Sequence, residues 1–140
     1  MSLPNTANFA KDLRDYLIAD NGVSTALGQR IYWQRAPQAP STPFAVLSTI
    51  SATAEFTHDG PVDLEQDRIQ VDVFAPTKAA SLTAANAIKQ ALTALDHTTQ
   101  GDTVLEWAHF DSARWEWENE SDEYRTSYDY IIYFQDAVPA

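Results

Sequence analysis

The sequence of 140 residues contains no cysteine. This absence excludes a disulfide framework, a thiolate zinc site and a cysteine nucleophile. Glycine is also scarce, and the four glycines are Gly22, Gly28, Gly60 and Gly101. Each of them is isolated, whereas a phosphate-binding loop needs several glycines close together. A nucleotide-binding loop of that kind is therefore not expected.

Positive charge is in short supply as well. Nine Lys and Arg residues stand against 20 Asp and Glu residues, which gives a net charge of −11 and a pI near 4.4. The nine cations are scattered along the chain, whereas tight binding to phosphates needs several of them in a cluster. Specific nucleic-acid binding is therefore not expected.

Long apolar runs are missing too. A membrane-spanning helix needs about 20 consecutive apolar residues, and every apolar run in this sequence is far shorter. The N-terminal segment also lacks the basic leader and apolar stretch of a secretory signal. The chain is expected to be made in the cytoplasm as a soluble product with no membrane contact.

Enough apolar material is present for one hydrophobic core. Hydrophobic residues make up 44% of the chain and aromatic residues 11%. A chain of this size buries about two-thirds of the surface that it exposes when unfolded. No internal repeat, low-complexity segment or shift in composition marks a boundary, so residues 1–140 are expected to form a single domain.

Hydrophobic periodicity divides the chain into helices and strands. In DRIQVDVFA, Asp67–Ala75, the apolar residues alternate with polar ones, which predicts a half-buried strand. After Pro76 the period changes from two to about 3.6, which predicts a helix with Leu82, Ala85, Ile88, Leu92 and Leu95 on one face. In chain order the expected elements are a helix over Asn5–Asp20, a short strand before Phe44, strands over Phe44–Phe56 and Asp67–Ala75, a helix from Thr77 to Leu95, and strands over Thr103–Glu118 and Glu123–Gln135. Turns are expected at 21–28, 58–61 and 96–102.

This order of elements predicts an α+β fold. The strands are joined mainly by short turns, which favours a mostly antiparallel sheet of four to five strands. Two main helices, both amphipathic, are expected to pack on one face of that sheet. The other face is left for solvent or for a partner.

The segment RWEWENESDEYR, Arg114–Arg125, is the richest in carboxylates and aromatic residues. Aromatic and charged residues alternate along it, as in a strand, so a hairpin with a loop over 119–122 is expected. That register places Trp117 opposite Tyr124, Glu116 opposite Arg125 and Glu118 opposite Glu123. The aromatic residues then share one face and the charged residues the other.

Two uses of this hairpin stay open. Aromatic residues on a strand pack most often in a core, but part of the set is also suited to a subunit or partner interface. The candidate interface residues are Trp115, Trp117, Tyr124, Tyr128, Glu116 and Arg125. Alternatively, carboxylates over Glu116–Glu123 could serve a small acidic metal-dependent or carboxylate-dependent hydrolase. Hydrated carboxylates at a hairpin end rarely have the burial that such chemistry needs, so no catalytic residue, metal or cofactor is assigned.

Histidines give no metal-binding motif. His58, His97 and His109 lack the His-x-x-x-His or His-x-His spacing of common metal sites. His58 lies near Asp59 and Asp63, but a histidine in a turn beside acidic residues is more often a solvated side chain. No metal site is predicted there.

Three stretches, in this order, resemble a known family. They are LGQRIYWQRAPQAPSTPFAVL at Leu27–Leu47, DRIQVDVFAPTKAASLTAANAIKQAL at Asp67–Leu92, and YRTSYDYIIYF at Tyr124–Phe134. The first is similar to a Gly-x-Arg-Ile-Tyr pattern followed by Ala-Pro, the second to an Arg-x-Gln-Val-Asp-Val strand that runs into an Ala-rich helix, and the third to a final strand. Together they resemble the small tail-completion or tail-terminator proteins of long-tailed bacteriophages and phage-derived particles.

The resemblance implies assembly rather than catalysis. Proteins of this family form a ring, commonly hexameric, that caps the finished tail tube and offers the surface to which the DNA-filled head attaches. The implied partners are further copies of the chain, the tail tube protein and a head-completion or connector protein, and the implied location is the head-proximal end of the virion tail. DNA would pass through the ring without specific binding. A second possibility within assembly is an adaptor of another phage-tail-like apparatus.

Overall fold

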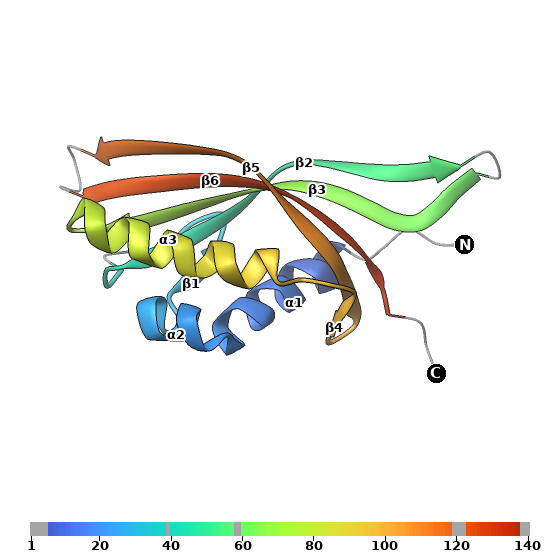
Figure 1. Cartoon of the computed structure of the whole chain (residues 1–140), viewed down its shortest axis with the longest axis horizontal. Coiled ribbons are helices and arrows are strands. Elements are labelled where there is room, and N and C mark those ends of the chain that lie inside the picture. Colours follow the sequence, from blue (N-terminus) through green and yellow to red (C-terminus); the bar gives the residue numbers. More distant parts are fainter. Residues whose placement is uncertain (1–5, 39, 58–59, 119–122, 138–140) are drawn as a thin grey trace.

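A computed structural model describes residues 6–38, 40–57, 60–118 and 123–137. Within these residues the chain forms three helices and six strands (Figure 1). In chain order they are α1 (Thr6–Ala19), α2 (Asn21–Leu27), β1 (Ile31–Trp33), β2 (Phe44–Thr57), β3 (Gly60–Ala75), α3 (Lys78–Thr93), β4 (Thr98–Gln100), β5 (Thr103–Glu118) and β6 (Glu123–Asp136). The long elements match the predicted ones in kind, but β3 begins at Gly60, inside the predicted turn at 58–61, rather than at Asp67. Of the short elements, β1 was expected before Phe44, and α2 and β4 were missed.

One sheet contains all six strands, in the order β1-β2-β3-β6-β5-β4. The predicted α+β class is confirmed, but the predicted sheet is wrong in two respects. The sheet has six strands rather than four to five, and it is mixed, because β1 runs parallel to β2. All other strand pairs are antiparallel. The three helices lie together on one face of the sheet (Figure 1), which we call the helix side, and we call the other the open side.

The predicted turn after the first helix is a second helix. Asp20 ends α1 and caps α2, because its carboxylate accepts the Val23 N–H at 3.0 Å. Val23 and Leu27, four residues apart, are both buried. Gly28 ends α2 with a φ of 60°, a left-handed conformation that favours glycine.

Helix α3 follows the predicted pattern closely. The side chain of Thr77 caps it by accepting the Ala80 N–H at 3.1 Å. Ala85, Ile88 and Leu92 of the predicted stripe are buried against the sheet. Small residues beside the stripe let the helix lie close to the sheet, as shown by the buried side chains Ser81, Ala84 and Ala91.

The predicted polar turn at 96–102 contains a strand. Thr98–Gln100 form β4, which pairs with Thr103–Leu105 at the start of β5. The turn between them is tied to α1, because the Asp12 carboxylate accepts the Asp102 N–H at 3.0 Å and the Thr103 hydroxyl at 2.7 Å. Asp12 is itself buried, so one side chain of α1 holds this edge of the sheet in place.

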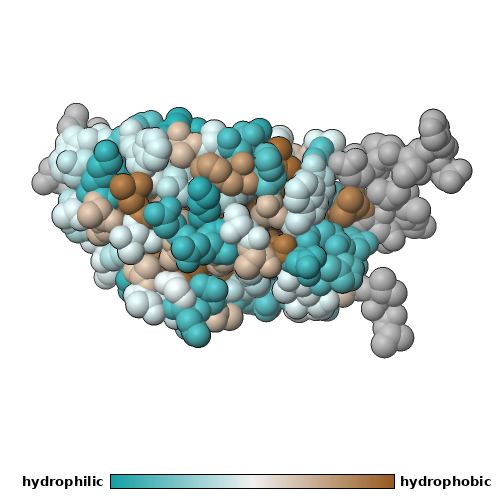
Figure 2. Space-filling model, in the orientation of Figure 1, coloured by the Kyte–Doolittle hydropathy of each residue, from teal (hydrophilic) through white to brown (hydrophobic). Residues whose placement is uncertain are grey.

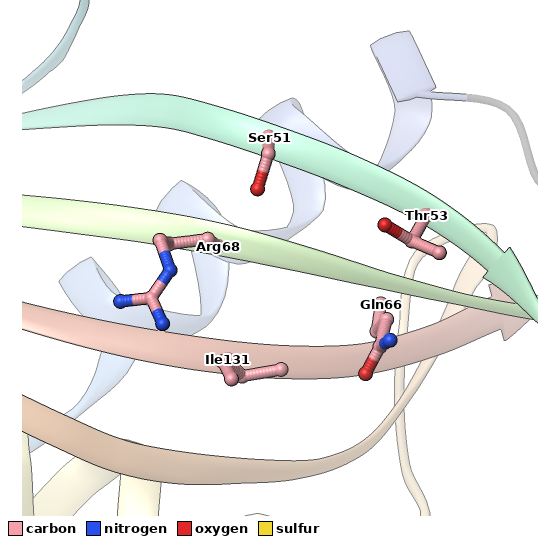
Figure 3. Close-up of a pocket in the computed structure, with 5 residues that line it drawn as sticks. All are labelled: Ser51, Thr53, Gln66, Arg68 and Ile131. Atoms are coloured by element: carbon pink, nitrogen blue, oxygen red, sulfur yellow. The ribbon is translucent and has the colours of Figure 1, made fainter.

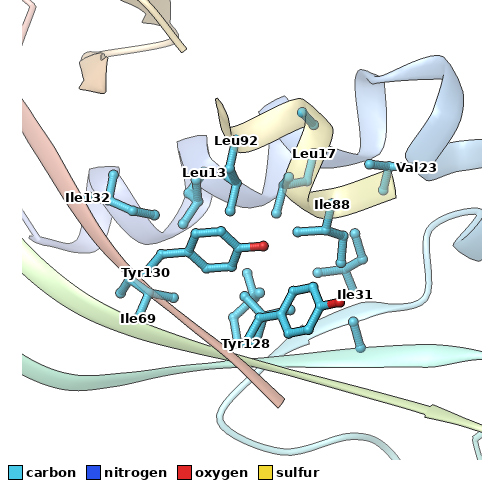
Figure 4. Close-up of a cluster of buried hydrophobic side chains, with 14 of the residues drawn as sticks. Leu13, Leu17, Val23, Ile31, Ile69, Ile88, Leu92, Tyr128, Tyr130 and Ile132 are labelled. Carbon is cyan, nitrogen blue, oxygen red and sulfur yellow. The ribbon is translucent and has the colours of Figure 1, made fainter. Parts of the chain in front are cut away.

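The core lies between the helices and the helix side of the sheet (Figure 4). Leu13 and Leu17 of α1 and Ile88 and Leu92 of α3 point towards the ring of Tyr130, which stands on β6. At another part of the core Phe9 stacks on Phe134, with ring centroids 3.7 Å apart. The core thus uses one face of every long strand and leaves the open side without a helical cover. No described helix is long and apolar enough to cross a membrane.

Candidate functional site

The hairpin of β5 and β6 has the predicted register. Trp117 pairs with Tyr124, Glu116 with Arg125 and Glu118 with Glu123. The Arg125 guanidinium donates a hydrogen bond to the Glu116 carboxylate, as predicted for the charged face. The predicted loop over 119–122 lies outside the described residues.

The aromatic residues of the hairpin divide into two groups. Trp115 and Trp117 are 53% and 43% exposed, and the Trp117 ring meets the Tyr124 ring edge-on at 4.6 Å. Tyr128, by contrast, is buried under α3, and its hydroxyl donates to the Asn86 side chain at 3.2 Å. Including Tyr128 among the surface candidates was wrong, because the helix covers that part of the sheet.

The exposed aromatic residues lie near Lys78, the first residue of α3. Together with Lys78, the side chains of Trp115, Glu116, Trp117 and Tyr124 line a shallow hollow of about 160 Å³. We call Trp115, Trp117 and Tyr124 the hairpin patch. Because exposed aromatic clusters suit protein contacts better than isolated apolar residues do, this patch is a candidate interface.

The open side carries charged residues in mutual contact at its centre. Arg68 donates to Asp111 at 2.8 Å and lies 3.6 Å from Asp129. Arg114 reaches Asp129 at 3.5 Å and Gln70 at 3.2 Å. Both arginines are thus paired with carboxylates, so neither presents an isolated positive charge to a nucleic acid.

A second hollow lies beside this network (Figure 3). Ser51 and Thr53 from β2, Gln66 and Arg68 from β3, and Ile131 from β6 line a volume of about 90 Å³. Small-molecule sites usually enclose about 300 Å³ or more. The size and the polar lining therefore argue against a substrate pocket at this position.

A buried acid pair lies on the helix side of β3. Asp67 is fully buried and Glu65 nearly so. Neither carboxyl oxygen of Asp67 receives a hydrogen bond from a donor in the described residues, and the same holds for Oε2 of Glu65. The pKa of Asp67 is raised to about 8, mainly by burial and then by a hydrogen bond with Glu65 and charge repulsion from it. A proton on Asp67 lets one carboxyl donate to the other, which explains how two acids share this space.

The chemistry considered for the hydrolase alternative finds little support in this geometry. Glu116 is about half exposed and paired with Arg125. No group of three His, Asp or Glu side chains within the described residues is placed to hold a metal ion. His58 and Asp59 lie outside those residues, and the side chain of Asp63 is not described. Among the described carboxyl groups, the raised pKa belongs to Asp67, which is buried away from the hairpin.

The surface in view is mixed rather than dominated by one apolar area (Figure 2). Single apolar groups lie among polar ones, as is normal for a folded domain. Besides the hairpin patch, the large exposed apolar residues of the described chain are Ile50 on β2 and Trp107 on β5. Trp107 lies on the open side and stacks on Tyr133 at 4.7 Å. The alternation of residues in the sequence did not predict that Ile50 and Trp107 would be exposed. A register shift in the strand pairing lies beside each of them, and the regular alternation is broken there.

Comparison with known proteins gives a family and a fold. The sequence profile of the family described as tail completion protein gp17 matches residues 11–135. No protein of curated function matches the chain. A solved structure described as the virion of a native gene transfer agent particle is similar over 89% of this chain and 92% of its own, with a TM-score of 0.72 and 16% identity. A second solved structure is similar over 96% of this chain and 94% of its own, with a TM-score of 0.53 and 16% identity. At such identities the likeness establishes the fold alone.

Proposed function

The chain belongs to the family of tail completion protein gp17, and we propose from this premise that its copies form a ring that caps the tail tube and joins it to the head. Membership makes the chain a structural protein of the phage tail, located in the virion tail and assembled with other tail or head proteins. The ring, its six copies and the identity of the neighbours belong to the proposal. The proposed neighbours are the tail tube protein and a head-completion or connector protein. A structural family also favours a role without catalysis, and we propose none.

The observation that carries the assembly proposal is the hairpin patch. Two tryptophans on one short strand segment stay about half exposed in the single chain, although the core nearby is well filled. Burying a large aromatic side chain stabilises a contact by roughly 1.5 to 3 kcal/mol. A copy or partner that covers both rings would therefore gain substantially, and the paired Glu116 and Arg125 on the other face give the same strand a polar side.

The proposal is tested by adding purified protein to tail tubes that lack it. Six copies of a 15.6 kDa chain give a ring of about 94 kDa, which native mass spectrometry resolves on or off the tube. Electron microscopy should show the ring at one end of each tube, and such tubes should then accept filled heads. Protein that never binds tube ends would refute the proposal, whereas a monomer in isolation would not, since the tube can trigger assembly.

The hairpin patch yields a specific prediction. Changing Trp115 and Trp117 together to serine is expected to lower binding to tail tubes at least tenfold, because the double variant removes about 3 kcal/mol or more of contact. The melting temperature should change by only a few degrees, because both rings are half exposed. Tube binding is measured by co-sedimentation, and melting by circular dichroism.

The matched control is Trp107→Ser. Trp107 is 49% exposed, like the two tryptophans of the hairpin patch, but it lies on the open side of the sheet. This variant should bind tubes like the unchanged protein. Equal losses in the control and the double variant would mean that the hairpin patch has no special role.

We also propose that the open side faces the lumen of the ring. Six copies at −11 each carry −66 in all, and a lumen with part of that charge would let DNA pass without sticking. The pairing of Arg68 and Arg114 with Asp111 and Asp129 supports this assignment, because it neutralises both arginines. A ring structure with a strongly basic lumen would contradict it.

Removing the paired carboxylates should therefore make the ring hold DNA. Changing Asp111 and Asp129 together to asparagine is expected to produce DNA binding by assembled rings at 50 mM salt, and the binding should weaken strongly by 200 mM. Gel-shift titration with duplex DNA measures it. The control changes Asp15 and Asp96 to asparagine, which alters the net charge equally but away from the open side. Equal DNA binding by both variants would reject the lumen assignment.

A further inference from the structure

Two strands have long edges that no other strand covers within the described part of the chain. β1 pairs only with Ala45–Leu47, so β2 is uncovered over Ser48–Thr57 on the side away from β3. β4 pairs only with Thr103–Leu105, so β5 is uncovered over Trp107–Glu118 on the side away from β6. Such edges carry unpaired backbone N–H and C=O groups, which favour pairing with another strand.

The hydrogen bonds of the two residues that flank β1 show which backbone groups of β2 point outward. The Ala45 N–H donates to the Arg30 carbonyl at 2.9 Å, and the Leu47 carbonyl accepts the Gln34 N–H at 2.7 Å. Alternate residues of β2 thus direct their backbone groups away from β3. Thr49 is next in this alternation, so its N–H and C=O point out at the start of the uncovered edge.

The first part of the β2 edge lacks two common protections against pairing, charge and proline. Proteins commonly shield an edge strand with charged residues or proline. From Phe44 to Ala54 the sequence contains neither. Ile50 lies at an irregularity between Thr49 and Ser51 and is 53% exposed, so an apolar side chain stands on this bare edge.

We propose that the uncovered edge of β2 in one copy pairs with the uncovered edge of β5 in the next copy. This inference rests on the proposed ring and states what holds it together. The two edges lie on opposite sides of one sheet, so every contact is head-to-tail and each copy uses both edges, as a closed ring requires. The hairpin patch belongs to the β5 edge and its hairpin partner, so the two candidate contact regions are continuous.

The strand directions make this junction antiparallel. The order β2, β3, β6, β5 alternates in direction, because each neighbouring pair is antiparallel. A copy rotated about an axis from which the strands are only moderately tilted therefore brings its β5 beside β2 in the opposite direction. Antiparallel pairing is slightly more stable per residue than parallel pairing.

When the midpoints of the uncovered edges of β2 and β5 are aligned, Ala52 of one copy lies opposite Ala113 of the next. Both lie on the helix side, since Ala52 pairs with the buried Asp67 and Ala113 packs against the core. This register shifts neighbouring copies along the strands, as the tilt of a closed sheet demands. It also leaves β1 at one end of the shared ladder and the next copy's β4 at the other, so neither short strand blocks the junction.

A pair of engineered cysteines tests the junction directly, because the native chain has none that could interfere. The double variant Ala52→Cys, Ala113→Cys is assembled on tail tubes and treated with an oxidant or, separately, with a bismaleimide of about 8 Å reach, which also spans diagonal neighbours across strands. The expected product is a ladder of covalent multimers on a denaturing gel. Each single variant, and the control Ala52→Cys, Thr83→Cys with its second cysteine on the exposed face of α3, should stay monomeric.

The outcomes separate this inference from the function on which it rests. A ring of the expected mass on the tube without any covalent ladder would overturn the edge pairing and leave the tail-capping role intact. Dimers from Ala52→Cys alone would show β2 against β2 and would also overturn it. Failure of the cysteine-free protein to bind tubes would overturn both proposals.

Blocking the edge provides a second test. Ile50→Lys places a charge on the bare strand and is expected to reduce ring formation at least tenfold, because an edge lysine opposes strand pairing. Since Ile50 is exposed, the melting temperature should stay within a few degrees of that of the unchanged protein. Thr83→Lys on α3 is the control for the added charge. Normal ring formation by Ile50→Lys would contradict the pairing.

Discussion

Replacing Asp67 with asparagine is expected to stabilise the protein by about 3 to 5 kcal/mol above pH 8, and by only about 1 to 2 kcal/mol near pH 5. Asp67 is fully buried beside Glu65, and its pKa is raised from 3.8 to about 8. Between these values the folded chain holds a proton that the unfolded chain has lost. Stability therefore falls as pH rises from about 4 to 8, and the whole loss is in place above that range.

Asparagine removes this dependence because it stays neutral and still donates a hydrogen bond. Its amide can point at Glu65 as the protonated Asp67 carboxyl does at low pH, so the variant resembles the protonated protein at every pH. Urea unfolding at pH 5, 7 and 9 measures the difference. The free energy of unfolding of the unchanged protein should drop across the series, and that of the variant should drop less.

Asp72→Asn is the control on the same strand. The Asp72 carboxylate, on the open side of the sheet, accepts hydrogen bonds from Ser127 and from Gln70 at 2.9 Å. Replacing it removes an acceptor that is in use, so this variant should lose about 1 to 2 kcal/mol. A stability of the unchanged protein that rises from pH 5 to pH 9 would contradict the shared proton.

The long elements were predictable because their periodicity is strong. In the hairpin, alternation of Trp115, Glu116 and Trp117 settled the faces, and a four-residue loop settled the register with Tyr124 and Arg125. Both were confirmed. The sequence also indicated where Asp67 would lie. Asp67 is two residues before the buried Ile69 on β3, so strand alternation places both side chains on the same face of the sheet.

Of the short elements only β1 was expected, and α2 and β4 could not be predicted, because tertiary contacts hold them. Helix α2 has seven residues and contains Asn21 and Gly22, which favour a turn when taken alone. Strand β4 is only Thr98–Gln100, and its hydrogen bonds exist because β5 lies beside it. The uncovered edges follow from where these short strands stop, and the exposure of Ile50 follows from a bulge. The candidate contact surfaces of this protein therefore depend on features that a sequence pattern does not carry.

Removing the Asp12 carboxylate should cost about 3 kcal/mol of folding free energy, or about 10 °C in melting temperature, in Asp12→Ala. Asp12 is buried and accepts two hydrogen bonds, from the Asp102 N–H and the Thr103 hydroxyl, across 90 residues of sequence. Its loss leaves two polar groups without their partner, one of them on the buried Thr103. Thermal unfolding followed by circular dichroism measures the effect.

The same contact explains why the neighbouring turn needs glycine. Gly101 has a φ of 58°, and a side chain built on it would run into the Asp12 carboxylate, so Gly101→Ala should also destabilise the protein. Asp15→Ala is the control one turn further along α1, where the carboxylate only pairs with the exposed Lys11 at 2.9 Å, and it should melt close to the unchanged protein. Equal melting of Asp12→Ala and Asp15→Ala would show that α1 is held to the sheet by apolar packing alone. A selective loss in Asp12→Ala would instead identify this carboxylate as the anchor for β4, the strand that ends the uncovered edge of β5.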